Sequence, residues 1–125
     1  MLDKLREFQA GPDPFGRTWK VHFGWLQNGI SIRHADTVDV KFGVSADGAP
    51  FDERIIALPH PALLAAAKQT GHALTDAWCL KIAALHLKHM LATGEDLEKT
   101  LVTVPQAELE QHARELKDAQ AAMNR

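Results

Sequence analysis

The segment from Thr75 to Gly94, TDAWCLKIAALHLKHMLATG, constrains the fold more than any other part of this chain. Its side chains are apolar nearly all round the helix that they would form, and a helix of this kind is buried. Thr75 is a favourable N-cap, Asp76 lies near the positive end of the helix dipole, and Gly94 can end the helix. We therefore expect one buried helix through the middle of the fold.

The composition is that of an ordinary globular domain. The chain has 125 residues, of which 46% are hydrophobic and 24% are charged. The 14 basic and 16 acidic residues give a net charge of -2, so no basic field is available to hold nucleic acid, and no nucleic-acid partner is expected. No apolar run reaches the roughly 18 residues that cross a bilayer. With a single cysteine and no apolar leader segment, we expect a cytoplasmic protein without a membrane partner.

The chain changes character once along its length. Residues 15–58 have the patterns of strands, whereas residues 60–122 have those of helices. Strands in one stretch and helices in the next are typical of the α+β class. We expect a single domain over residues 1–125 with two layers, in which a three-stranded antiparallel meander packs on the buried central helix, with flanking helices.

The first predicted strand has period-two alternation, with one bulky face. Its bulky side chains are Trp19, Val21, Phe23 and Trp25. Asn28-Gly29 then predicts a two-residue hairpin turn. A second strand is expected from Ile30 to about Val44, followed by a turn at Asp47-Gly48 and a third strand from about Phe51 to Leu58.

The flanking helices are predicted from shorter signals. Leu2, Leu5 and Phe8 have helical spacing, which predicts a short helix over residues 2–9. A second helix is expected from Pro61 to about Gln69, with Gly71 as its C-cap. The last helix, about 105–122, carries a thin apolar stripe typical of a surface helix or of one that packs against a second copy of the chain. Residues 101–104 are ambiguous.

Two histidines on the central helix are the candidate metal ligands. His86 and His89 are three residues apart, so they can ligate one ion from one helix face, provided that a further ligand comes from elsewhere. The alternative is that His86 is a core histidine bonded to a backbone carbonyl or a carboxylate, while His89 is partly exposed. Cys79 is expected to pack as a small hydrophobe. His112, on the charged last helix, is expected to be exposed.

The predicted second strand contains two polar residues with the same parity as its apolar row. In a regular strand, His34 and Asp36 would point into the core, where an unpaired aspartate is unfavourable. One explanation is a bulge or break at residues 33–36 that turns them outward. The other is a polar pocket between the sheet and the central helix, in which His34, Asp36 and His86 are candidate catalytic residues and Asp36 orients a histidine.

Two classes of function remain open. The first is a small non-enzymatic binding, regulatory or protein-interaction module, whose partner is another protein or a second copy of the chain. It is favoured because no phosphate loop, dinucleotide fingerprint or other specific catalytic motif is present in the sequence. The second is a metal-dependent or acid–base enzyme with a His/Asp site between sheet and central helix. No cofactor is predicted beyond this possible divalent metal ion.

Overall fold

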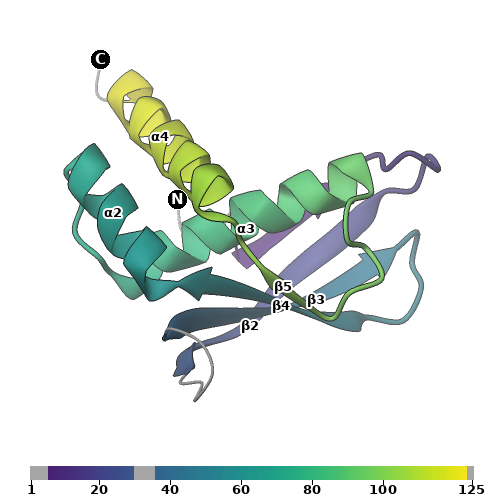
Figure 1. Cartoon of the computed structure of the whole chain (residues 1–125). Coiled ribbons are helices and arrows are strands. Elements are labelled where there is room, and N and C mark those ends of the chain that lie inside the picture. Colours follow the sequence, from purple (N-terminus) through teal and green to yellow (C-terminus); the bar gives the residue numbers. More distant parts are fainter. Residues whose placement is uncertain (1–5, 30–35, 124–125) are drawn as a thin grey trace.

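The computed structural model describes residues 6–29 and 36–123. It is an α+β domain with a five-stranded sheet and three helices in the described part (Figure 1). The strands are β1 (Glu7–Ala10), β2 (Trp19–Gly29), β3 (Thr37–Ala46), β4 (Asp52–Pro59) and β5 (Leu101–Thr103). The helices are α2 (His60–Thr70), α3 (Asp76–Thr93) and α4 (Gln106–Met123).

The sheet is mixed, with its strands in the order β1-β2-β3-β4-β5. The first four strands are antiparallel neighbours, and β5 returns parallel to β4 after the chain has passed through α2 and α3. All three helices lie on one side of the sheet (Figure 1). The predicted α+β class is confirmed, but the three-stranded meander is extended by a strand at each edge. The two-layer description is also incomplete, because α4 packs on α2 and α3.

The strand β1 replaces part of a predicted helix. Residues 7–10 pair with β2 from Glu7 opposite His22 to Ala10 opposite Trp19. The helix predicted over residues 2–9 is therefore wrong for residues 7–9, while residues 2–5 lie outside the described part. The spacing of three apolar residues was a weak signal, and pairing with β2 supplies backbone hydrogen bonds that an isolated helical turn could not form.

The connection between β2 and β3 is longer than the predicted turn. Asn28 and Gly29 are not turn residues, because they continue β2 and pair with Val38 and Thr37. The connection thus spans residues 30–36, and the predicted beginning of the second strand at Ile30 lies outside the described residues. Beyond it the predicted alternation is confirmed. The buried residues of β3 that face the helices are Val38, Val40, Phe42 and Val44.

A bulge in β2 changes the face on which its later side chains lie. Phe23 and Trp25 pair with consecutive residues of β3, so Gly24 has no partner. A Cβ atom at Gly24 would lie 3.2 Å from the carbonyl oxygen of Lys41, which favours glycine at this position. The extra residue reverses the alternation. Trp25 therefore lies beside Lys41, on the side away from the helices, and the prediction that it shares a face with Trp19 is wrong.

The central helix has the predicted limits. The hydroxyl oxygen of Thr75 accepts a hydrogen bond of 3.2 Å from the backbone N–H of Trp78, as an N-cap does. Gly94 ends the helix in the left-handed conformation, at φ 80°. In between, residues such as Ile82 and Leu91 are fully buried, and each contributes about 1.5–3 kcal/mol of transfer free energy. α3 thus forms the centre of the core, as its composition predicts.

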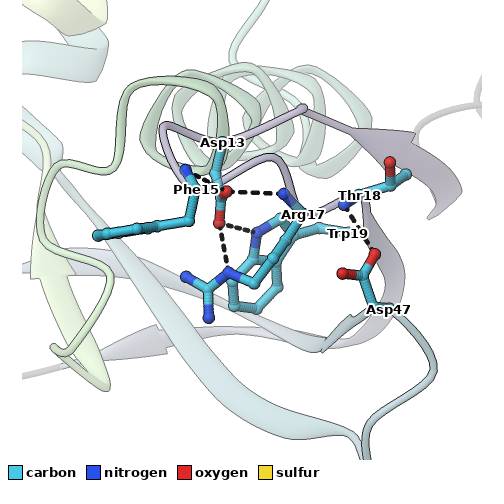
Figure 2. Close-up of polar contacts among 6 residues, drawn as sticks. All are labelled: Asp13, Phe15, Arg17, Thr18, Trp19 and Asp47. Atoms are coloured by element: carbon cyan, nitrogen blue, oxygen red, sulfur yellow. Dashed lines mark hydrogen bonds and ion pairs between the residues drawn. The ribbon is translucent and has the colours of Figure 1, made fainter.

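The loop between β1 and β2 is organised by the carboxylate of Asp13, whose side chain is 0% exposed (Figure 2). Its Oδ1 accepts from the backbone N–H groups of Phe15 and Arg17, each at 2.9 Å. Its Oδ2 accepts from Arg17 Nε at 2.7 Å and from Trp19 Nε1 at 3.0 Å. Burial alone would raise the pKa of Asp13, but these hydrogen bonds lower the pKa to about 2. Asp13 therefore joins the loop to the core residue Trp19.

A second carboxylate ties this loop to the next turn. Asp47 accepts a hydrogen bond of 3.0 Å from the backbone N–H of Thr18 (Figure 2). Its own N–H donates to the carbonyl oxygen of Thr18 at 2.9 Å. Asp47 and Gly48 both have positive φ, as the predicted Asp-Gly turn requires.

No helix in the described part of the chain is long and apolar enough to cross a membrane.

Candidate functional site

The candidate residue His86 lies on α3 and faces α4 rather than the sheet. It is 3% exposed, and its Nδ1 is 3.1 Å from Nε2 of His112 on α4. The same Nδ1 is 3.5 Å from Oε2 of Glu108. His86 is buried, as one of the two sequence-based alternatives expects, but its hydrogen-bond partner is a second imidazole from a helix 26 residues further along the chain.

Both imidazoles are neutral at neutral pH because of where they lie. Burial lowers the pKa of His86 to about 4, and the charges that His112 and His89 can carry act in the same direction, against the attraction of Asp96. Burial likewise lowers the pKa of His112, although Glu115 and Glu108 oppose it. Two neutral rings form a single N–H···N hydrogen bond, in which one donates and the other accepts. Nδ1 of His112 is buried without a hydrogen-bond partner among the described residues.

The other candidate metal ligand, His89, faces a different neighbour. Its side chain is 43% exposed, and its Nε2 is 3.3 Å from Oε2 of Glu95. The ring centroids of His86 and His89 are 6.2 Å apart. Across residues 6–29 and 36–123, no three His, Cys, Asp or Glu side chains already surround one point as ligands of a metal ion would.

The two candidates from the β2–β3 region are not brought to His86 by any described contact. His34 lies outside the described residues. Asp36 immediately precedes β3 and is exposed, and its backbone carbonyl accepts a hydrogen bond of 2.8 Å from the N–H of His60. Its exposed side chain is what the outward-turned alternative expects.

A pocket of about 360 Å³ lies between α3 and α4, next to the pair of His86 and His112. Its walls come from one helical stripe of each helix, and both stripes carry polar groups. The lining residues are Leu85, Lys88, His89, Ala92, Glu108, Gln111, His112 and Glu115. The pocket is open to solvent, so a small polar ligand or an ion can reach the edge of the buried histidine pair.

The face of the sheet away from the helices carries a row of large side chains across four strands. Trp25 pairs with Lys41, Lys41 with Ile55, and Ile55 with Leu101. We call these four residues the outer row. Directly paired residues point to the same side of a sheet, and Nζ of Lys41 lies 5.7 Å from the centre of a Trp25 ring. Leu101, on the edge strand β5, is 57% exposed.

No family model, curated protein or solved structure matches this chain. Its functional candidates therefore come from the chemistry of its own residues. The histidine pair offers two neutral nitrogen donors beside a carboxylate, and the outer row offers an apolar contact surface.

His112 is the residue that the sequence-based interpretation misplaced most clearly. It was expected to be exposed on a charged helix, yet it is 6% exposed. The signal was present in the stripe of α4, because His112 is three residues after Leu109 and four before Leu116, both of which pack against the core. A polar residue in such a stripe needs a partner from another element, and here the partner is His86.

Cys79 packs in the core as expected, and its reactivity follows from its position. It is 2% exposed, and burial together with the charge of Asp76 raises the pKa of its thiol to about 12. Because the thiolate is the reactive form, we expect an aromatic disulfide reagent to modify Cys79 only on the timescale of unfolding at pH 7. Stopped-flow absorbance, compared with the reaction in denaturant, measures this. Modification within seconds in the native protein would contradict the expectation.

Proposed function

We propose that this chain is a non-enzymatic protein-interaction module that self-associates through the outer row of its sheet. The single observation that carries the proposal is the bulge at Gly24, which turns Trp25 away from the core and onto the sheet face opposite α2, α3 and α4. Bulges re-aim side chains in this way, and tryptophan is among the residues that contribute most to protein–protein binding.

The inner and outer rows of the sheet differ in what covers them. The neighbours that face the helices, Val40, Ile56 and Val102, are at most 5% exposed. No helix within residues 6–29 and 36–123 covers the outer row (Figure 1). Its exposed member Leu101 lies on the edge strand β5. Apolar side chains grouped on an otherwise open sheet face are typical of a contact surface.

The charges around the outer row favour a second copy of the chain as the partner. Lys41 forms an ion pair with Glu53 at the centre of this face, so the surface carries both signs side by side. In a twofold-symmetric dimer, each copy presents the same patch to the other. Because this patch carries both charge signs, a positive group of one copy can pair with a negative group of the other. A patch of one sign would instead bring like charges together. The edge strands β1 and β5 have 4 and 3 residues, too few for extensive edge-to-edge pairing.

The test is the oligomeric state of two matched leucine variants. We expect the wild type to sediment as a dimer and the Leu101→Ser variant to shift towards monomer by at least about tenfold in dissociation constant, since one buried leucine contributes about 1.5–3 kcal/mol. Leu64→Ser is the control, because Leu64 is 52% exposed and belongs to α2, a helix on the other side of the sheet (Figure 1).

Sedimentation equilibrium over a wide range of protein concentrations measures the dimer dissociation constants of the wild type and of the two variants. A monomeric wild type throughout that range would refute self-association, and an equal effect of Leu64→Ser would place the interface on the helical side. The sequence-based alternative, an enzyme built on His34, Asp36 and His86, stays a prediction, because His34 lies outside the described residues.

A further inference from the structure

We propose that His86 and His112 bind one divalent transition-metal ion of the zinc class, with Glu108 as a third ligand. This site lies between α3 and α4, on the helical side of the sheet, so it is independent of the outer row. It differs from the pair expected from the sequence, because His112 from another helix takes the place of His89.

The distances within the pair fit a common ion. Tetrahedral zinc with bonds of 2.0–2.1 Å separates its ligand atoms by roughly 3.3 Å. Nδ1 of His86 is 3.1 Å from Nε2 of His112 and 3.5 Å from Oε2 of Glu108, on either side of that value. Two of the three donor pairs therefore already have the required spacing.

The third pair explains why the described residues show no complete cluster. Glu108 and His112 are one turn apart on α4, and they form no ion pair with each other in the structure. The side chain of Glu108 is 41% exposed, so it can rotate towards the ion without disturbing the core. The two histidines, in contrast, are held by packing, so the site consists of a fixed nitrogen pair and a movable carboxylate.

The surroundings supply what such an ion needs. An imidazole binds a metal ion through an unprotonated ring nitrogen. On binding, the ring proton of His86 or His112 that lies between the two nitrogens moves to the other nitrogen of its ring. The pocket between α3 and α4 gives the ion a path to the pair, and His112 lies in its wall. Nitrogen and carboxylate ligands together suit zinc and its neighbours better than calcium or magnesium.

The experiment is a calorimetric titration of the full chain with Zn²⁺, with Co²⁺ absorption as a second probe. We expect one ion per chain and a tetrahedral Co²⁺ spectrum. His112→Leu removes a ligand and fits the apolar stripe of α4; its affinity should fall by more than about 100-fold, since even loss of a residue that only orients a ligand costs 10–100-fold. His89→Leu is the matched control in the same pocket and should keep the wild-type affinity.

Glu108→Gln is the second variant, because its exposed position lets the chain fold whatever happens to the histidines. We expect it to bind Zn²⁺ about tenfold or more weakly and to change the Co²⁺ spectrum. Three results would overturn the proposal: no saturable binding by the wild type, wild-type affinity in a folded His112→Leu, or an equal loss in His89→Leu. The last of these would show that His89 contributes to the site as much as His112 does, so that His86, His112 and Glu108 would not be the ligand set.

Discussion

Replacing Phe42 with alanine is expected to lower the free energy of unfolding by about 3–5 kcal/mol. Phe42 lies on the central strand β3, is 0% exposed, and faces the helices. Its ring also packs edge-on against Phe23 on β2, with the ring centres 6.2 Å apart. Removing the ring takes away apolar contacts in the core and leaves a cavity, which adds to the loss of transfer free energy.

Phe15 provides the matched control for this substitution. It is 78% exposed at the tip of the β1–β2 loop, and its ring only lies beside the guanidinium of Arg17, at 5.3 Å. Phe15→Ala is therefore expected to cost less than about 1 kcal/mol. Urea unfolding followed by tryptophan fluorescence compares the two variants. A similar cost for both would mean that Phe42 is not part of the core.

The elements predicted correctly from the sequence are those whose signals are local. The limits of α3 follow from a cap at Thr75 and a glycine at Gly94, each of which acts within a few residues of its own position. The buried row of β3, from Val38 to Val44, follows from strict alternation. In both cases the side chains that decide the structure are neighbours in the sequence or one turn apart, so the pattern alone was sufficient.

The features that were missed depend on partners distant in the sequence. The bulge at Gly24 lies against the carbonyl oxygen of Lys41 on the next strand. An isolated glycine in a strand suggests a bulge or a close backbone approach, but only the pairing with β3 shows which of the two it is. The pairing of His86 with His112 needs α4 to pack beside α3. β5 has three residues and is stabilised by its parallel neighbour β4. Tertiary contacts therefore determine the bulge, the histidine pair and β5, and with them which histidine lies beside His86.

The second large effect is expected at Asp13. Asp13→Ala should lower the unfolding temperature by about 10 °C, because four hydrogen bonds end on this carboxylate and their donors, including the buried Nε1 of Trp19, would lose their partner. Asp47→Ala is the control. Its carboxylate accepts a hydrogen bond at an exposed site, from the N–H of Thr18, so its effect should be several times smaller. Differential scanning calorimetry at pH 7 compares them.

The effect of Asp13 should also depend on pH with a definite sign. The pKa of Asp13 falls from 3.8 to about 2 in the folded state, so between these values the unfolded chain binds a proton that the folded chain does not. Its stabilisation is therefore complete above about pH 4 and is lost as the pH falls through 2. Asp13→Asn lacks this titration, since an amide does not ionise. The difference in unfolding temperature between wild type and Asp13→Asn should narrow as the pH falls from 5 to 2. If the difference stays constant over that range, the charge of Asp13 does not stabilise the loop, and only the shape of the side chain does.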